Sequence, residues 1–217
     1  MHDVVQNLLL IENLLKAKNK NKKLPKIIAV SKTFPISAVY PLIDHGHVHF
    51  GENKVQESIE KWTDVKKKFV QVKLHMIGRL QTNKVKYVLP LFDYIHSLDS
   101  LKLAKKISEE QEKQNKKLKI FIQLNIGNEE QKSGIEIKYL EEFYKICIND
   151  LNLDIIGLMC LPPKNLEASI YFSKMQNTLK KTDLAEISMG MSSDFLSAIN
   201  YGTTFLRIGS KIFGNRD

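Results

Sequence analysis

The sequence predicts an α/β protein whose eight parallel strands close into a (β/α)8 TIM-type barrel. Two observations support this prediction. Short apolar runs rich in β-branched residues alternate with segments of helical periodicity, and polar, glycine-containing clusters follow the runs rather than precede them. The chain has 217 residues, of which 43% are hydrophobic, enough for one core, so we expect a single domain over residues 1–217. An open doubly wound sheet is the structural alternative that the alternation allows.

The runs that predict strands lie at 26–31, 47–51, 73–77, 94–98, 119–126, 155–161, 186–189 and 203–208. The clearest helical segments lie at 54–68, 101–113, 139–149, 166–180 and 194–201. An additional amphipathic helix is expected before the first strand, where Val4, Val5, Leu8 and Leu15 belong to a broad apolar face. We do not expect this segment to be a secretory signal, because its lysines follow the apolar part.

The charge and the cysteines limit the class of protein. Lys and Arg number 33 against 24 Asp and Glu, and only Arg79, Arg207 and Arg216 are arginines, which leaves thirty lysines. Nucleic-acid sites usually use arginine for bidentate contacts. The excess of lysine over arginine therefore favours a solvated surface, and a nucleic-acid-binding patch is the alternative. No apolar stretch approaches the roughly 20 residues of a membrane helix. Cys147 and Cys160 form no CxxC pair, and we expect buried thiols in a reducing cytoplasm.

The polar clusters that follow the predicted strands gather the candidate chemistry at one end. They include Ser-Lys-Thr at 31–33, Gly-Glu-Asn at 51–53, Gly-Arg-Leu-Gln-Thr-Asn-Lys at 78–84 and Arg-Ile-Gly-Ser at 207–210. In barrels and open α/β sheets alike, the active face lies at the carboxyl ends of the strands.

Lys32 is the candidate reactive residue. It directly follows the run Ile-Ile-Ala-Val-Ser at 27–31, and an ammonium at the inner end of a buried strand is costly. Burial and nearby positive charge lower a lysine pKa and free the amine to attack a carbonyl. A lysine that merely extends to solvent from a strand end is the alternative.

Two segments near the end of the chain predict a phosphate site. Ser-Met-Gly-Met-Ser-Ser-Asp at 188–194 offers a glycine turn and then a serine, Ser192 or Ser193, that would cap the following helix, with Gly202 closing it. Backbone N–H groups at such a helix start attract phosphate. The 207–210 segment adds a second glycine approach with a hydroxyl beside it. Phosphate sites after strands seven and eight recur in barrels, although each segment alone could be an ordinary turn.

Arg207 precedes the second glycine turn. A guanidinium cannot accept a proton, so beside a cofactor ring it would keep a pyridine nitrogen unprotonated and weaken the ring as an electron sink. A structural ion pair is the other interpretation. Together with the lysine and the phosphate segments, Arg207 describes a site for an imine-forming cofactor tethered by its phosphate.

These segments resemble the YggS/PROSC family of pyridoxal 5'-phosphate homeostasis proteins, which are similar to the N-terminal barrel of alanine racemase. The resemblance rests on Ile-Ala-Val-Ser-Lys-Thr (28–33), His-Phe-Gly-Glu-Asn-Lys-Val-Gln-Glu (49–57), His-Met-Ile-Gly-Arg-Leu-Gln-Thr-Asn-Lys (75–84), Ser-Leu-Asp-Ser (97–100), Gln-Leu-Asn-Ile (123–126), Gly-Leu-Met-Cys-Leu-Pro-Pro (157–163) and the block from Ser188 to Arg216. The segments cover nearly the whole chain in order. Ser-Leu-Asp-Ser replaces the family's usual Ser-Val-Asp-Ser, and Ser210 stands where threonine is frequent, but neither change removes a donor.

The resemblance implies pyridoxal phosphate on Lys32, phosphate contacts from Ser192, Gly209 and Ser210, and a ring-nitrogen contact from Arg207. It also implies that Asn53 and the turn at Ile77 and Gly78 line the ring. Members of this family have no established catalytic activity and are associated with balancing pyridoxal phosphate and amino-acid or keto-acid pools. The resemblance favours a cytoplasmic monomer, and pyridoxal-phosphate-dependent enzymes are possible partners.

Three functions follow as hypotheses. The leading one is a carrier of pyridoxal phosphate without turnover, because nothing beyond the barrel supplies the second base that racemization needs. The alternative is a pyridoxal-phosphate-dependent amino-acid racemase with Lys32 as one base. A nucleic-acid-binding module rests only on the net charge of +9, and we expect neither nucleic acid nor membrane as a partner. We expect His75 to be a hydrogen-bonded wall residue, whereas Lys84 and Lys132 face either the mouth or solvent.

Overall fold

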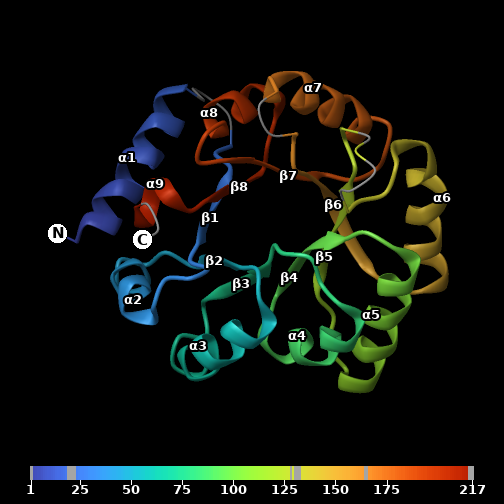
Figure 1. The fold of residues 1–217 in the computed structure, drawn as a ribbon, viewed down its shortest axis with the longest axis horizontal. Coiled ribbons are helices and arrows are strands. Elements are labelled where there is room, and N and C mark those ends of the chain that lie inside the picture. The colour runs from blue at the N-terminus through green and yellow to red at the C-terminus, as the bar shows by residue number, and fades with distance from the viewer. Residues whose placement is uncertain (1, 19–22, 128, 130–132, 164–165, 215–217) are drawn as a thin grey trace.

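Eight parallel strands form a closed barrel, and helices surround it (Figure 1). The computed structural model describes residues 2–18, 23–127, 129, 133–163 and 166–214. The strands follow one another around the barrel in chain order, from β1 to β8. This arrangement confirms the predicted (β/α)8 barrel and excludes the open doubly wound sheet.

Each strand pairs in parallel with its two neighbours, and β1 pairs with β8 to close the ring, with Ile28 opposite Arg207 and Ala29 opposite Ile208. The strands are β1 Lys26–Val30, β2 His49–Glu52, β3 Lys73–Met76, β4 Tyr94–Leu98, β5 Lys119–Leu124, β6 Asp154–Cys160, β7 Glu186–Met191 and β8 Phe205–Ile208. The α-helices are α1 Asp3–Lys18, α2 Ile36–Asp44, α3 Val55–Lys68, α4 Val85–Leu91, α5 Leu101–Gln114, α6 Leu140–Lys145, α7 Ala168–Leu179, α8 Phe195–Ala198 and α9 Ser210–Phe213.

The apolar side chains divide into two layers. The larger cluster fills the space between the barrel and the helices, and Ile27 and Ala29 of β1 belong to it. The smaller cluster contains Ile28 and Val30 of the same strand together with Phe121 and Phe205. Because successive strand residues point to opposite faces, this alternation assigns the smaller cluster to the barrel interior. The barrel interior is therefore a packed core and not an open channel.

The expected N-terminal helix is present as α1, which buries Val5, Leu8, Ile11 and Leu15. It lies beside α9 at the other end of the chain (Figure 1), and Asn7 Nδ2 donates a 3.0 Å hydrogen bond to the Ile212 carbonyl. This contact links the first helix to the short helix that follows β8, close to the mouth.

Helices α2 and α4 were not among the clear predictions from the sequence. Each contains a proline, Pro41 in α2 and Pro90 in α4, and proline removes a backbone donor and interrupts the helical pattern. The predicted helix at 139–149 is divided into α6 and a π-helical turn, Ile146–Asp150. The predicted helix at 194–201 is likewise divided into α8 and the 3-10 turn Ile199–Tyr201.

None of the helices among the described residues is long and apolar enough to cross a membrane. The two cysteines are both buried and free, as expected from the sequence. Burial raises the pKa of Cys147 and of Cys160 to about 12, so neither thiol ionises near neutral pH.

Four histidines lie on or beside β2, β3 and β4, and burial lowers the pKa of each. The pKa values of His47 and His49 fall to about 4. His75 and His96 are fully buried, and their pKa values lie well below 6.5. All four side chains are therefore neutral at pH 7. His75 is hydrogen-bonded, as expected, but it lies buried in the barrel interior and does not line the cavity at the mouth.

This burial predicts acid destabilisation in a defined pH window. A histidine in the unfolded chain titrates near pH 6.5, whereas the same histidine in the folded protein binds its proton only at a lower pH. The unfolding free energy is therefore unaffected above about pH 6.5 and decreases as the pH is lowered from there. Each such histidine contributes a slope of up to about 1.4 kcal/mol per pH unit as the pH falls from about 6.5 toward 4. Urea denaturation at pH 7.5, 6.0 and 5.0 measures the fall, and His75→Gln reduces its slope. An unfolding free energy that stays constant from pH 7.5 to 5.0 would contradict the neutral assignment.

Candidate functional site

A cavity of about 1300 Å³ opens at the carboxyl-terminal mouth of the barrel. The residues that the sequence singled out for this site all line it: Lys32, Asn53, Ile77, Gly78, Ser192, Arg207, Gly209 and Ser210. The first four follow β1, β2 and β3, whereas the last four come from β8 and the loops after β7 and β8. Residues far apart in the chain are thus gathered around one space.

Lys32 lies in a turn that begins where β1 ends. The backbone N–H of Phe34 donates to the Ser31 carbonyl at 3.1 Å, which closes the turn around Lys32 and Thr33. Thr33 has φ of 71°, a left-handed conformation that a β-branched residue rarely adopts. Its N–H donates to Glu57 Oε1 at 2.7 Å, which holds it there. The backbone on both sides of Lys32 is therefore fixed.

A buried carboxylate anchors the end of β1 from outside the barrel. Glu52 Oε1 accepts hydrogen bonds from the Ser31 hydroxyl at 2.7 Å, Lys61 Nζ at 2.8 Å and Trp62 Nε1 at 3.0 Å. Lys61 Nζ also donates to the Ser31 carbonyl at 2.7 Å. The Glu52 side chain is fully buried, and that of Lys61 is 7% exposed. This network connects the end of β1 with β2 and α3, and it includes Ser31, the residue that precedes Lys32.

The side of the cavity formed after β7 and β8 offers backbone and hydroxyl donors. Ser192 Oγ accepts from the N–H of Gly209 at 3.3 Å and from the N–H of Lys211 at 3.4 Å. Both bonds are long for N–H···O, so these donors remain available to a better acceptor. The expectation that Ser192 or Ser193 caps the helix after β7 is wrong, since Asp194 is the N-cap residue of α8 and its Oδ1 accepts from the Met191 N–H. Gly202 ends that helical segment with φ of 76°, as predicted.

Arg207 is 4% exposed and lies in the cavity wall. Its Nη1 donates to the Ser188 carbonyl at 2.8 Å and to Ser188 Oγ at 2.6 Å, and its Nη2 donates to the Cys160 carbonyl at 2.8 Å. Within the described residues no carboxylate forms a salt bridge with it. Desolvation lowers the pKa of Arg207 below its usual value, yet a guanidinium remains charged at neutral pH. The expectation of a structural ion pair is therefore not met in the part of the chain described.

The loop after β2 supplies an acceptor. Asn53 Oδ1 is buried, and no group of the described residues donates a hydrogen bond to it. Gly78, after β3, is required at its position, because a Cβ there would lie 2.4 Å from the Asn53 carbonyl oxygen. The two loops therefore touch, and they leave an amide oxygen in the wall that a polar ligand atom could satisfy.

The charge of the cavity favours anions. Its described lining includes three cations, Lys32, Arg79 and Arg207, and one carboxylate, Glu129. Neither Glu129 nor Gln123 and Ser133, which also line it, was singled out for the cavity from the sequence. Asn125 braces this side, because its side chain bonds both the N–H and the carbonyl of Glu129, at 3.1 and 2.9 Å. Among the described residues, no group of His, Cys, Asp or Glu is placed to hold a metal ion.

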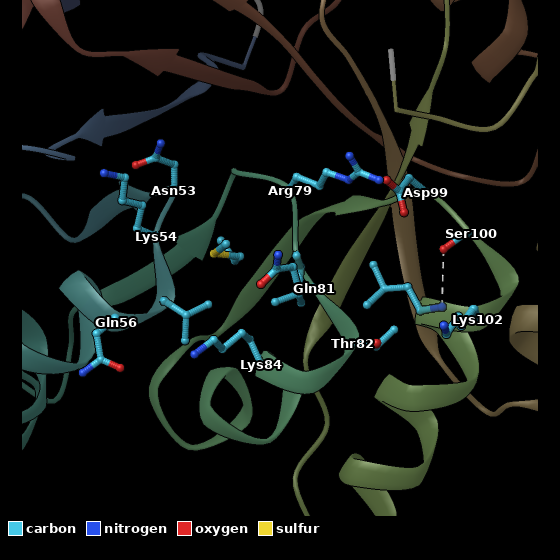
Figure 2. Close-up of a pocket in the computed structure, with 14 residues that line it drawn as sticks. Asn53, Lys54, Gln56, Arg79, Gln81, Thr82, Lys84, Asp99, Ser100 and Lys102 are labelled. Carbon is cyan, nitrogen blue, oxygen red and sulfur yellow. Dashed lines mark hydrogen bonds between the residues drawn. The ribbon is translucent and has the colours of Figure 1, made fainter. Parts of the chain in front are cut away.

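A second cavity of about 680 Å³ adjoins the first, and Asn53 and Arg79 line both (Figure 2). In this view Arg79 extends toward Asp99, and Lys84 lies below it. The sequence left open whether Lys84 and Lys132 face the mouth or solvent. Lys84 lines the second cavity and not the first. The other, Lys132, lies outside the described residues, as does Arg216.

The fold and the cavity define a barrel of the alanine racemase type. Residues 9–217 match the family described as the alanine racemase N-terminal domain. Alanine racemase from Clostridium difficile is similar with a TM-score of 0.73 at 15% identity, over 99% of this chain and 57% of that one, which is a likeness of fold alone.

The chain belongs to the family of pyridoxal phosphate homeostasis proteins. It is 36% identical to the pyridoxal phosphate homeostasis protein of Haemophilus influenzae, over 95% of this chain and 92% of the relative. It is 33% identical to that of Escherichia coli, over 100% of this chain and 98% of the relative. The structure of PipY from Synechococcus elongatus, which has pyridoxal phosphate bound, is similar with a TM-score of 0.86 at 28% identity, over 97% of this chain and 100% of PipY.

The buried ion pair beneath Lys32 predicts a strong dependence of stability on both partners. Glu52→Gln leaves the Lys61 ammonium buried without its counter-charge, so we expect the free energy of unfolding to fall by about 3–5 kcal/mol. The double variant Glu52→Gln with Lys61→Met removes both charges and is expected to recover most of that loss. Urea midpoints measure the effect, with the exposed pair Lys67 and Asp64 as the control. Equal losses in the single and the double variant would rule out the pairing as the cause.

Proposed function

We propose that this protein binds pyridoxal 5'-phosphate as a Schiff base on Lys32 and holds it for pyridoxal phosphate homeostasis in the cell, without turning over a substrate. The observation that carries the proposal is the convergence of Lys32, the donors around Ser192 and the Arg207 guanidinium on one cavity. The names of the relatives and the bound ligand of PipY support the same cofactor.

The cavity residues divide the binding task among themselves. When bound, pyridoxal phosphate supplies an aldehyde that condenses with an amine and a pyridine ring that can accept electrons. Lys32 supplies the amine. Ser192, Gly209 and Ser210 supply hydroxyl and backbone donors for a phosphate. Arg207 offers N–H groups to the ring nitrogen, and Asn53, Ile77 and Gly78 form the wall on the side of β2 and β3.

The lining also favours a carrier over a racemase. Racemization needs a second acid–base group on the opposite face of the ring from the lysine. The described residues of the lining include no tyrosine, histidine or cysteine, and Glu129 is their one carboxylate. Arg207 further weakens the ring as an electron sink, because it holds the nitrogen without protonating it. Both features suit storage of the aldehyde better than carbanion chemistry.

Replacement of the reactive lysine tests the linkage. Lys32→Ala is expected to abolish the imine absorbance of protein mixed with pyridoxal phosphate and to abolish fixation of the cofactor by borohydride, because Lys32 is the one lysine among the described residues that line the cavity. Lys84→Ala, which changes a lysine of the adjoining cavity, is expected to leave both unchanged. Absorption spectra before and after borohydride, with mass spectrometry of the labelled peptide, measure the result.

Two outcomes would contradict this proposal. An undiminished imine band in Lys32→Ala would place the linkage elsewhere. Repeated turnover of L-alanine or L-serine to the D form by the wild type, lost in Lys32→Ala, would replace the carrier with the racemase alternative.

The phosphate side can be tested by affinity. Ser192→Ala removes a hydroxyl from the donor group at the cavity, so we expect the apparent Kd for pyridoxal phosphate to rise about tenfold or more, the size of one hydrogen bond to a charged group. The affinity for pyridoxal, which lacks the phosphate, is expected to change little. Ser197→Ala on α8 serves as the control. If Ser192→Ala weakened the affinity for pyridoxal phosphate and for pyridoxal equally, Ser192 would not be a phosphate contact.

A further inference from the structure

A chain of hydrogen bonds runs through the barrel interior from Arg207 to the opposite end of the sheet. Arg207 Nη1 donates to Ser188 Oγ at 2.6 Å. Ser188 Oγ lies 2.9 Å from His96 Nδ1, His96 Nε2 lies 2.9 Å from His75 Nδ1, and His75 Nε2 lies 3.0 Å from His49 Nδ1. Ser188, His75 and His96 are fully buried. These groups come from β8, β7, β4, β3 and β2, and only Arg207 lines the cavity.

The direction of every bond follows from the arginine. A guanidinium only donates, so Ser188 Oγ accepts from Arg207. Among the described groups the other partner of this hydroxyl is His96 Nδ1, so the buried hydroxyl proton finds an acceptor only when it is directed to His96 Nδ1. A neutral His96 that accepts at Nδ1 carries its proton on Nε2, which donates to His75 Nδ1. By the same reasoning His75 donates from Nε2 to His49 Nδ1. Arg207 and the two partners of the Ser188 hydroxyl thus fix the tautomers of three neutral histidines.

The surroundings keep the three rings neutral. Burial lowers their pKa values first, and nearby positive charge lowers them further, while Asp93 has the opposite effect on His49. Tyr94 stacks on His75 with ring centroids 4.2 Å apart, and Phe121 stacks on His96 at 4.3 Å. The groups whose charges act on the histidines are Lys26, His47, Lys73, Asp93 and Arg207, besides the histidines themselves.

We propose that Ser188, His96, His75 and His49 form a polarised relay that positions the Arg207 guanidinium as a charged donor toward the ring nitrogen of the bound cofactor. Each imidazole in this arrangement directs its lone pair toward Arg207 and its N–H away from it. The negative ends of three aligned dipoles therefore face the guanidinium and offset the cost of its burial without neutralising it. A carboxylate at Ser188 would pair with the guanidinium and draw it from the ring. The relay residues act through Arg207, which is the group that meets the cofactor under the proposed function.

Nuclear magnetic resonance of the full-length protein labelled with ¹⁵N-histidine tests the relay without any variant or cofactor. Long-range ¹H–¹⁵N spectra at pH 7 are expected to show His49, His75 and His96 neutral and protonated on Nε2. A proton on Nδ1 of His96, or a charged His96, would overturn the assignment.

Substitution of Ser188 tests whether the relay acts on the arginine. Ser188→Ala removes the hydroxyl but keeps the backbone carbonyl bond to Arg207, so His96 Nδ1 loses its donor and we expect the single tautomer pattern to be lost. Ser188→Thr keeps the hydroxyl and is expected to keep the pattern. His47→Gln is the matched control, since the hydrogen bonds of His47 among the described groups go to the backbone of His49 and of Ile27 and not to a side chain of the relay. Should Ser188→Ala fail to fold, the wild-type pattern and Ser188→Thr still decide the assignment.

The bound cofactor gives a second, independent signal. With pyridoxal phosphate added, the pH titration of the imine band in Ser188→Ala is expected to shift upward by about 0.5–1 pH unit, because a guanidinium that withdraws from the ring opposes imine protonation less. Ser188→Thr and His47→Gln are expected to titrate like the wild type. An unshifted titration in Ser188→Ala would refute the positioning role. Absence of an imine in the wild type would instead refute the proposed function, and the tautomer pattern would then be judged by the resonance data alone.

Discussion

The pairing of β1 with β8 is the interaction on which the candidate site depends. Lys32 and Arg207 are separated by most of the chain, yet Ile28 of β1 lies opposite Arg207 of β8 in the closing register. An open sheet in chain order would place these two strands at opposite edges, and the Lys32 amine and the hydrogen-bond donors around Ser192 would not share a cavity. Because all strands are parallel, closure surrounds one mouth with their carboxyl ends, so two unremarkable turns and one lysine come to line a single cavity.

Much of this arrangement could be predicted from the sequence because the signals are local. Alternation of apolar runs with helical segments gave the barrel, and the position of polar clusters after the strands gave the face on which Lys32, Gly209 and Ser210 lie. Helices interrupted by Pro41 or Pro90 were harder to recognise, since their patterns are short and broken. The resemblance, rather than periodicity, supplied Asn53 and the turn at Gly78.

What the sequence could not supply are contacts between strands. Nothing around His75 or His96 indicates that the two rings meet, because their distance depends on the register of neighbouring strands and on the tilt of the barrel. Ser192 illustrates the same limit at a loop. Its position after β7 predicts a helix cap, but its hydroxyl instead reaches the N–H groups after β8, and Asp194 begins the helix. When a side chain has two possible hydrogen-bond partners, only the tertiary structure shows which of them it bonds.

The barrel buries charge in two different ways, which differ in whether the charge is neutralised. Outside the sheet, Glu52 and Lys61 neutralise one another and fix the end of β1, where a net charge would serve no ligand. Inside the sheet, Arg207 donates to two carbonyls and to the Ser188 hydroxyl, and the neutral imidazoles continue the chain beyond that hydroxyl, so its charge persists at the cavity wall. A carboxylate would bury the guanidinium at lower cost, but it would also cancel the field that the cavity presents. The more costly solution is the one that leaves a charged donor in the wall of the cavity that Lys32 also lines. In the relay proposed above, the interior histidines offset the cost of burying that charge.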